Sequence, residues 1–378
     1  MNTQTGCLRS DKSSKSLPVV MYHYVNEFAG SITVSPDCFE EHCRVLARHG
    51  WRGVGLDEAE DFLIRGKDLP KRSLLFTFDD GYLDNYVYAL PSLHRYGHRG
   101  VVFAVSNRIE GRLEPEDAPR VSLEDALSGS APALPEVSMP VKNTAEGFTR
   151  RRDVFLNRAE ARSMDAHGAL AVASHSRGHY LVCTGPEYNG FLRPGNLYRT
   201  FYHTEDALVW GSPAFTMGPG LLHRAFYPNP DLMDAIKALV PQDFAAAAAF
   251  FAKAEHLREL EALPGRFAGR LGRYEDDSER KERMWREIAG GKEELETVLG
   301  HGVRSLCWPW GAYCAGALAL AREAGFELFF TTSEGVNPPG QPTVHRFKGK
   351  CKSGNWLLSR ARIYASPLLG RLYAMTRL

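Results

Sequence analysis

The sequence predicts an α/β fold built on a parallel sheet or barrel. Short, almost continuous apolar runs alternate with amphipathic segments of helical period. Such runs are typical of strands that are buried on both faces, and their alternation with helices is typical of strand–helix–strand units. A chain of 378 residues with 44% hydrophobic residues is long enough for one large domain of this kind with insertions.

The predicted elements of the first half follow one another closely. The run 18–25 predicts a buried strand with His23 near its end. Ser35 followed by Pro36 is typical of a helix start, and Gly50 of a helix end. Two further helices are predicted to begin at capping boxes, formed by Asp57 with Glu60 and by Asn157 with Glu160. The remaining elements are a helix over 86–96 and strands over 74–80, 100–105 and 169–173.

The same rhythm returns near the C-terminus, with a helix over 278–299, a strand over 303–307, a helix over 315–324 and a strand over 326–332. Two stretches break it. Residues 107–152 are rich in Pro, Ser, Glu and Arg and show no sustained period. Residues 181–277 carry Gly, Pro and aromatic residues, and then an alanine-rich helix near 243–260. We therefore expect one domain over 17–352 with these two insertions, followed by a basic tail over 353–378.

The C-terminal end is strongly basic. From Gly335 to Leu378 the chain has no Asp or Glu but eight Lys and Arg residues, which favours an anionic partner. From Trp356 onward apolar residues and arginines interleave, with a break near Pro367. This pattern indicates either an interfacial helix pair on an anionic membrane or a helix docked on the domain with its arginines outward. No aromatic stacking module is recognisable, so a nucleic-acid partner is not expected.

Composition also bears on the compartment. The seven cysteines are odd in number, scattered and without a CxxC pair, so we expect reduced thiols. Residues 1–16 are polar and lack the apolar core of a secretory signal, and no apolar run is long enough to span a bilayer. The expected location is therefore the cytoplasm, with peripheral attachment to the inner face of the membrane through the tail.

An acidic pair, Asp79 and Asp80, follows directly on the strand that begins at Leu74. Adjacent strand residues point to opposite faces, so the two carboxylates share a site only if the backbone turns, as Gly81 permits. Two carboxylates so close together favour a cation beside them. A strand end followed by an ordinary Asp-Gly turn accounts for the residues equally well.

A second polar segment follows the strand over 169–173. His175 and His179 lie there, at the end of another predicted strand. In α/β folds the chemistry gathers at the C-terminal ends of strands. Two imidazoles and one carboxylate suit Zn²⁺, with Co²⁺, Ni²⁺ or Fe²⁺ as alternatives. A His-x3-His spacing on its own also arises by chance on polar loops.

These residues resemble the polysaccharide deacetylase family, which shares the NodB homology domain and is similar to carbohydrate esterase family 4. The segment 77–82 looks like the family's TFDDG motif, 175–179 like its HSxxH motif, and 308–313 like its groove-wall motif. Val19 to His23 resembles the opening strand of the branch that acts on N-acetylglucosamine polymers. The resemblance covers about 17–106, 153–182 and 278–346 and implies a distorted (β/α)7 barrel.

The resemblance also implies roles for individual residues. Asp80, His175 and His179 would hold one divalent metal, and Asp79 would be the general base. A metal lowers the pKa of water and polarises an acetyl carbonyl, and a neighbouring carboxylate can take the proton. His23 is the first candidate for the acid that protonates the leaving amine, and His345 is the second. His23 could also be a core histidine that donates to a backbone carbonyl, and His345 a solvated histidine in a basic loop.

The third motif departs from the family pattern. Many members carry an arginine there that pairs with the base, but Cys307 stands at that position, so Asp79 must be held by another group. Trp310 and Tyr313 can stack on a sugar, with Trp310 favoured as the groove wall, although both also suit a core.

The expected function is therefore metal-dependent removal of an N-acetyl group from an amino sugar. A lipid-linked or nucleotide-linked precursor of a cell-surface glycan suits the expected location better than a finished polymer. Two alternatives remain, a metal-dependent amidohydrolase of a non-sugar amide and a non-catalytic glycan-binding module. The intact pair Asp79 and Asp80 argues against the second, since binding alone needs no base.

Overall fold

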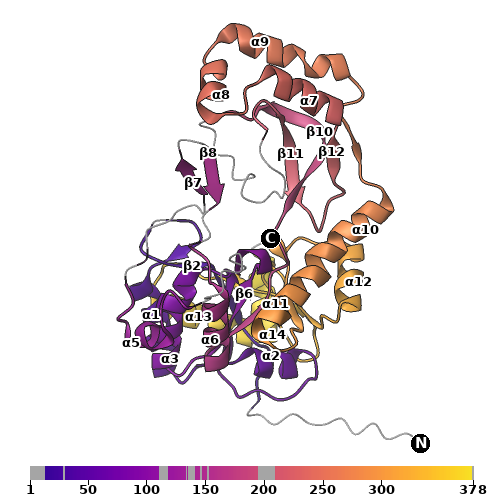
Figure 1. Cartoon of the computed structure of the whole chain (residues 1–378). Coiled ribbons are helices and arrows are strands. Elements are labelled where there is room, and N and C mark those ends of the chain that lie inside the picture. The colour runs from indigo at the N-terminus through magenta and orange to yellow at the C-terminus, as the bar shows by residue number, and fades with distance from the viewer. Residues whose placement is uncertain are drawn as a thin grey trace, which may run out of the picture.

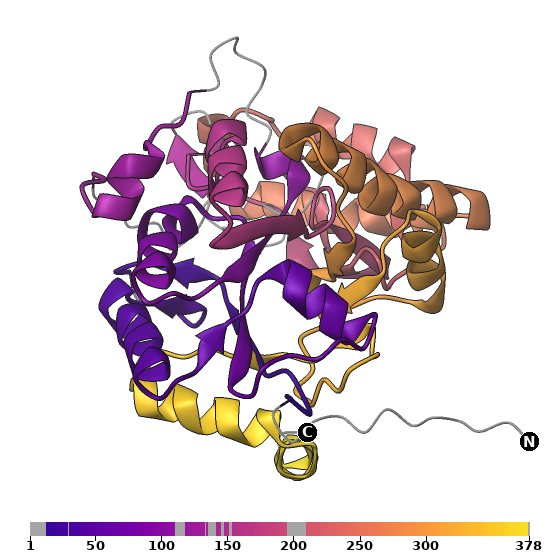
Figure 2. The same cartoon turned by 90° about the horizontal axis from the view of Figure 1, so that it is seen from below.

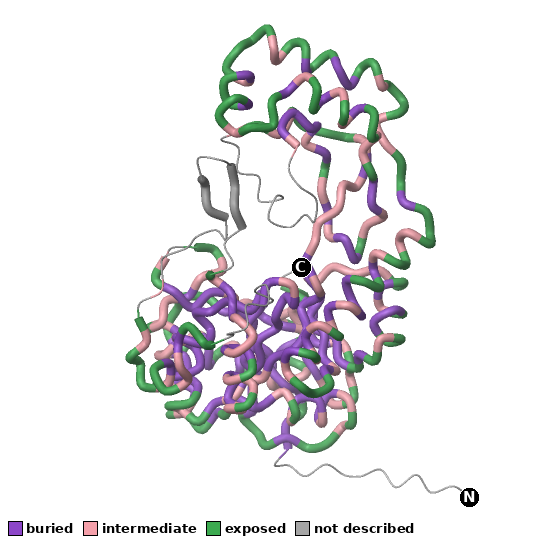
Figure 3. Tube along the Cα trace, viewed as in Figure 1, coloured by how far each residue is buried: buried purple, intermediate pink, exposed green. Residues whose placement is uncertain are grey.

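The computed structural model describes residues 13–28, 30–109, 118–132, 134, 141–144, 147–150, 153–194 and 209–376. Figure 1 shows a lower part, in which helices surround a curled sheet, and an upper lobe that contains β10–β12 and α7–α9. Buried residues are concentrated in the lower part, and the lobe is mostly exposed or half-buried (Figure 3). The main hydrophobic core therefore belongs to the curled sheet and its helices.

The central sheet is parallel throughout. Its strands lie in the order β16-β15-β14-β9-β6-β5-β1-β17, and β4 pairs with β5 beside this path. They are β1 (Val19–Tyr22), β4 (Arg52–Gly53), β5 (Ser73–Asp80), β6 (Gly100–Ala104), β9 (Leu170–Ser174), β14 (Ser305–Cys307), β15 (Leu328–Phe330), β16 (Thr343–Val344) and β17 (Phe347–Lys348). Because all strands of the path run in one direction, their C-terminal ends open on one rim.

One short segment joins the two edges of this sheet. β16 pairs with β15 at one edge and β17 pairs with β1 at the other, yet only His345 and Arg346 separate β16 from β17 in the chain. Counted as one interrupted strand, the segment 343–348 is the seventh strand of a distorted (β/α)7 barrel. The predicted fold class is therefore confirmed.

The helices of the barrel begin and end largely where their capping residues predict. They are α1 (Pro36–Arg48), α2 (Leu56–Leu63), α3 (Leu90–Arg95), α6 (Arg158–His167), α10 (Asp277–Trp285), α11 (Gly291–Leu299) and α12 (Ala315–Glu323). The Ser35 cap and the Asn157–Glu160 capping box are present. The predicted box of Asp57 with Glu60 is wrong: Glu58 bonds the Gly55 N–H at 3.1 Å.

Two predicted helices contain a π-helical turn. The helix expected over 86–96 begins with a π turn at Asn85–Ala89, and the one expected over 278–299 is interrupted by a π turn at Arg286–Gly290. A π turn inserts a residue into the helical repeat and is frequent at functional sites. Both turns carry residues that contact the site described below.

The insertions form separate small structures. The first contains α4 (Ser106–Ile109), α5 (Leu123–Ser128) and the hairpin β7 (Val141–Thr144) with β8 (Gly147–Arg150). Its residues 110–117, 133, 135–140, 145–146 and 151–152 lie outside the described ones. The second pairs β10 (Leu181–Phe191) with β11 (Pro213–Pro219) and β12 (Phe226–Pro228) with β13 (Gly272–Tyr274), beneath α7 (Pro230–Leu239). The predicted helix near 243–260 is two helices, α8 (Phe244–Phe251) and α9 (Ala254–Ala262). Minor pieces are β2 (Tyr24–Val25), β3 (Thr33–Val34) and 3-10 turns at Pro264–Phe267 and Pro309–Gly311.

The C-terminal helices differ from each other in burial. In α13 (Gly354–Ala365) the apolar side is buried against the barrel, and the Gly354 N–H donates to Glu41 of α1 at 3.0 Å. A Cβ at Gly354 would lie 2.5 Å from Val45, so the two helices approach closely there. In α14 (Pro367–Met375), by contrast, large apolar side chains are exposed. Figure 2 shows both helices, in yellow, along one edge of the barrel. Among the described residues, no helix combines the length and apolarity needed to cross a membrane.

Candidate active site

The acidic pair lies where β5 ends. The backbone turns there through two left-handed residues, Asp80 (φ +75°) and Gly81 (φ +76°). A Cβ at Gly81 would lie 3.0 Å from that of Ala104, so both backbone conformation and space require glycine. The turn lets Asp79 and Asp80 approach the same imidazole, because an oxygen of each lies within 4.8 Å of a His175 nitrogen.

Asp80, His175 and His179 form a cluster suited to a metal. Their ligand atoms lie within 4.8 Å of one another. The Nδ1 of His175 lies 2.8 Å from the Cys307 carbonyl oxygen, which can only accept, so Nε2 keeps its lone pair for a metal. Burial lowers the pKa of His175 and so favours the neutral imidazole. Two imidazoles and a carboxylate match a catalytic zinc site with a coordination position left open.

The loop that carries the histidines is held in a rarely adopted conformation. Ser176 (φ +66°) and His179 (φ +53°) are both left-handed. The Ser176 hydroxyl accepts from the His179 N–H at 3.1 Å and donates to Glu287 at 3.2 Å, and the Gly178 N–H donates to the same carboxylate at 3.0 Å. Glu287 lies in the π turn at Arg286–Gly290, so this turn positions the metal-binding loop.

Asp79 is held by an arginine rather than by the metal cluster. Arg346 donates to both carboxylate oxygens, at 2.6 and 2.8 Å, and both side chains are buried. The guanidinium also donates to the Thr331 carbonyl at 2.7 Å and to Thr77 at 3.2 Å. Burial raises the pKa of Asp79, but the neighbouring Arg346 and His175 outweigh burial and hold this pKa below its ordinary value. Asp79 is therefore ionised at neutral pH.

Arg346 takes the place of the arginine that is missing from the third motif, where Cys307 stands. No arginine stands in the third motif, but the closing segment 343–348 supplies one whose side chain enters the barrel and reaches Asp79. The Cys307 thiol lies beside the pair, 3.1 Å from Arg346 and 3.7 Å from Asp79. Sequence reasoning counted Arg346 among the cations of the basic end. The one signal for its role was its place, two residues after the buried Val344, in a strand-like run.

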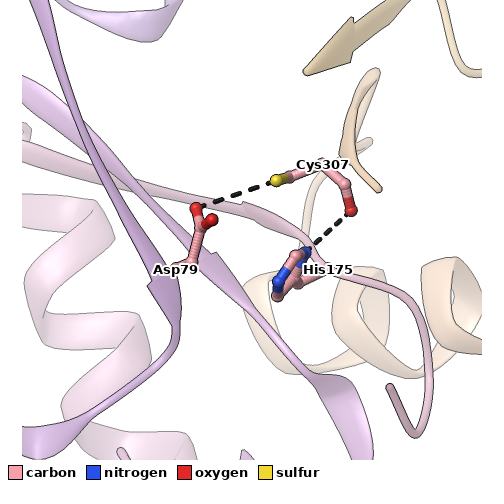
Figure 4. A group of neighbouring side chains, drawn as sticks. All are labelled: Asp79, His175 and Cys307. Carbon is pink, nitrogen blue, oxygen red and sulfur yellow. Dashed lines mark hydrogen bonds between the residues drawn. The ribbon is translucent and has the colours of Figure 1, made fainter. Parts of the chain in front are cut away.

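A second group, Asp79, His175 and Cys307, also brings three ligand atoms within 4.8 Å (Figure 4). It does not suit a metal. Both oxygens of Asp79 are engaged by Arg346. Burial raises the pKa of the Cys307 thiol well above its ordinary value, so the thiolate that a metal needs is disfavoured.

Residues 66–208 match the family model described as polysaccharide deacetylase. Over these residues the chain is similar to the polysaccharide deacetylase family. It is 34% identical over 102 residues to YxkH of Bacillus subtilis, whose name places it among the polysaccharide deacetylases. That match covers 27% of this chain and 36% of the relative, so the chain spans about a third of the length of the curated relative that it matches.

Solved deacetylase structures share the fold. A de-N-acetylase from Aggregatibacter actinomycetemcomitans superposes with a TM-score of 0.59 at 17% identity, over 91% of this chain and 99% of that one. The deacetylase domain of BpsB from Bordetella bronchiseptica gives 0.54 at 18% identity, over 90% and 98%. IcaB from Ammonifex degensii gives 0.52 at 19% identity, over 93% and 98%. At these identities the likeness concerns the fold alone.

The two candidate acids, His23 and His345, lie in different places. The Nε2 of His23 is 3.9 Å from an Asp79 oxygen, and its side chain is partly exposed. The His23 carbonyl accepts from Asn85, which lies in the π turn at Asn85–Ala89. His345 bonds Ser333 at 2.9 Å instead, and it precedes the inward-pointing Arg346, so it lies on the opposite side of the strand. The structure therefore brings His23, and not His345, close to Asp79.

The two candidate sugar-binding aromatic residues also lie in different surroundings. Trp310 (φ +55°) lies over His179, with ring centroids 4.0 Å apart, and remains 37% exposed. Tyr313 stacks instead on Trp308, which is fully buried in the core. Trp310 therefore stands at the wall of the site, whereas Tyr313 extends the packing of the core.

Sequence reasoning also missed Arg108. This residue follows β6 in α4, at the start of the first insertion, and donates to Asp80 at 3.0 Å. Its guanidinium lies 5.2 Å from the centre of the Phe155 ring. Arg108 and His179 thus approach the same Asp80 oxygen, Oδ1, at 3.0 and 3.8 Å.

Proposed function

We propose that this chain is a metal-dependent N-deacetylase of an amino sugar. One observation carries the proposal: the two adjacent carboxylates have different partners. Asp80 faces the imidazoles of His175 and His179 and accepts one hydrogen bond from Arg108. Asp79 instead has both of its oxygens held by Arg346. A binding site has no use for a carboxylate that is kept ionised next to a metal-ligand set, but amide hydrolysis needs a base there.

The residues present fit a divalent metal, with zinc preferred, held by Asp80, His175 and His179. When bound, such an ion supplies Lewis acidity toward the acetyl carbonyl and a lowered pKa of water. Asp79 takes a proton from the water molecule while the oxygen of that water bonds to the acetyl carbon. Its depressed pKa keeps it ionised for this step.

The amine leaves only after it is protonated. His23, 3.9 Å from Asp79, donates that proton as the carbon–nitrogen bond breaks. The products are acetate and the free amino sugar. Trp310, exposed at the rim above His179, offers an aromatic face to the sugar ring.

We propose a substrate linked to a lipid or nucleotide carrier, met at the cytoplasmic face of the membrane. None of the six cysteines that the structure describes forms a disulfide, as in a reducing compartment. The exposed side of α14 supports attachment to an anionic lipid surface, because Leu368, Leu369, Leu372 and Met375 are 54–70% exposed. Arg371 lies among them in a segment without acidic residues.

Acetate release from N-acetylated sugars on lipid and nucleotide carriers, with and without chelator, tests the proposal. We expect release that stops with chelator and returns with Zn²⁺. Metal analysis of the purified protein and of His175→Ala should show metal in the first and little in the second. Equal metal content in both would refute the ligand set. Metal binding without acetate release from any sugar would favour a non-sugar amide or a binding module.

A further inference from the structure

A cavity of about 540 Å³ lies between the barrel and the lobe of the second insertion. This volume falls within the range of sites that hold small molecules. Its walls come from β10, β11, the residues around β12, and the turns at Arg286–Gly290 and Pro309–Gly311. The apolar lining residues include Leu181, Val182, Leu192, Phe215, Met217 and Met233.

The cavity adjoins the candidate active site. Ser176, which follows the metal ligand His175 directly, lines it. So does Trp310, whose ring lies over His179 with centroids 4.0 Å apart. The cavity therefore begins beside the metal cluster, with Trp310 between the two.

The charged groups of the cavity wall already have partners. Arg283 donates to Glu275 at 2.7 Å and to the Gly220 carbonyl at 2.7 Å. Glu287 accepts from Ser176 and from the Gly178 N–H. A carbohydrate chain needs many hydrogen-bonding partners for its hydroxyl groups, and a site for it would present uncommitted ones. Predominantly apolar walls instead favour a ligand part without polar groups.

We propose that this cavity binds an aliphatic chain of an amphipathic substrate, next to the sugar whose acetyl group is removed. The inference rests on the proposed function, and it chooses the lipid-linked carrier over the nucleotide-linked one. The aliphatic chain of the substrate gains affinity because it leaves water, and Trp310 separates this aliphatic chain from the metal cluster. The second insertion is then the element that adapts the barrel to a lipid-borne sugar.

The first test compares alkyl 2-acetamido-2-deoxy-β-glucosides that carry methyl, butyl or octyl groups. We expect kcat/KM for acetate release to rise at least about 30-fold from methyl to octyl, since each buried methylene contributes up to about fourfold. Chitin oligosaccharides of two to four sugars should show no comparable rise. A rise with sugar number and none with alkyl length would overturn the inference.

Two leucines of the lobe provide matched variants. Leu181 lines the cavity, whereas Leu222 is 38% exposed and is not part of its wall. Leu181→Glu should remove the rise of kcat/KM with alkyl length, and Leu222→Glu should retain it. Met217→Glu, at a second half-buried wall position, replaces Leu181→Glu if that variant is unfolded by circular dichroism. Retained alkyl dependence in the folded wall variant would contradict the assignment.

A binding measurement distinguishes failure of this inference from failure of the proposed function. Octyl β-glucoside carries no acetyl group, and its binding is measured by calorimetry below its micellar concentration. If it binds wild type but not the wall variant while no glycoside is hydrolysed, the cavity assignment stands and the deacetylase proposal fails. If acetate is released equally from methyl and octyl substrates and octyl β-glucoside does not bind, the deacetylase stands and the cavity assignment fails.

Discussion

Replacement of Arg346 by methionine is the most informative single change, because it removes the partner of the base and leaves every proposed metal ligand in place. The guanidinium makes two hydrogen bonds to Asp79, and both groups are buried. Loss of one member of a buried ion pair leaves an uncompensated charge and costs about 3–5 kcal/mol. We expect Arg346→Met to lose this much free energy of unfolding at pH 7.

The pH dependence of the variant should have the opposite sign to that of the wild type. In wild type the folded pKa of Asp79 lies below its unfolded value, so its contribution to stability is present above the unfolded pKa and is lost as pH falls through the folded pKa. Without Arg346 the largest influence left is burial, which raises this pKa. The variant should therefore be less destabilised in acid than at pH 7, and the acidic limb of its activity should move to higher pH.

Urea unfolding of wild type, Arg346→Met, Asp79→Asn and the double variant, at pH 5 and pH 8, measures both effects. The double variant should be about 1–3 kcal/mol more stable than the sum of the single losses predicts. Arg346→Lys is the matched control, since it keeps the charge and loses the bidentate geometry. Strict additivity of the two single variants, together with an unshifted acidic limb in Arg346→Met, would refute the pairing.

Three further predictions concern the residues around this pair. Asp79→Asn should keep its metal by elemental analysis and lose most of its kcat, and near-normal turnover at saturating metal would exclude Asp79 as the base. His23→Ala should lower kcat by about 10²-fold or more and flatten the alkaline limb of the pH profile, whereas His345→Ala should change both only slightly; the reverse result would exchange their roles. Removal of residues 367–378 should reduce co-sedimentation with anionic vesicles without lowering the unfolding midpoint, and unchanged sedimentation would argue against α14 as the membrane contact.

The parts of the fold that sequence predicts well depend on local pattern. The strand that runs into Asp79 and the helix capped by Asn157 are specified by neighbouring residues, and both are present. The role of Arg346 depends on barrel closure, since 267 residues separate it from Asp79. No local periodicity reports a contact at that separation.

The residue that supports the loop carrying His175 and His179 could not be predicted from the sequence either. Glu287 looks like any charged residue of an amphipathic helix, and only the π turn at Arg286–Gly290 aims its carboxylate at Gly178 and Ser176. The same limit applies to Glu60, which was expected at a helix cap. In the structure its buried carboxylate accepts from Ser305 at 2.8 Å and from Arg304 at 2.7 Å, both more than 240 residues away.

When the segment 343–348 closes the barrel, it also completes the candidate active site. It is among the last parts of the barrel to leave the ribosome, and until it inserts between β15 and β1 the Asp79 carboxylate lacks its arginine. On the proposed mechanism, a barrel without this strand would be inactive, because Asp79 would lack the partner that keeps it ionised. A fluctuation that detached the strand would then stop hydrolysis while the rest of the barrel stayed folded.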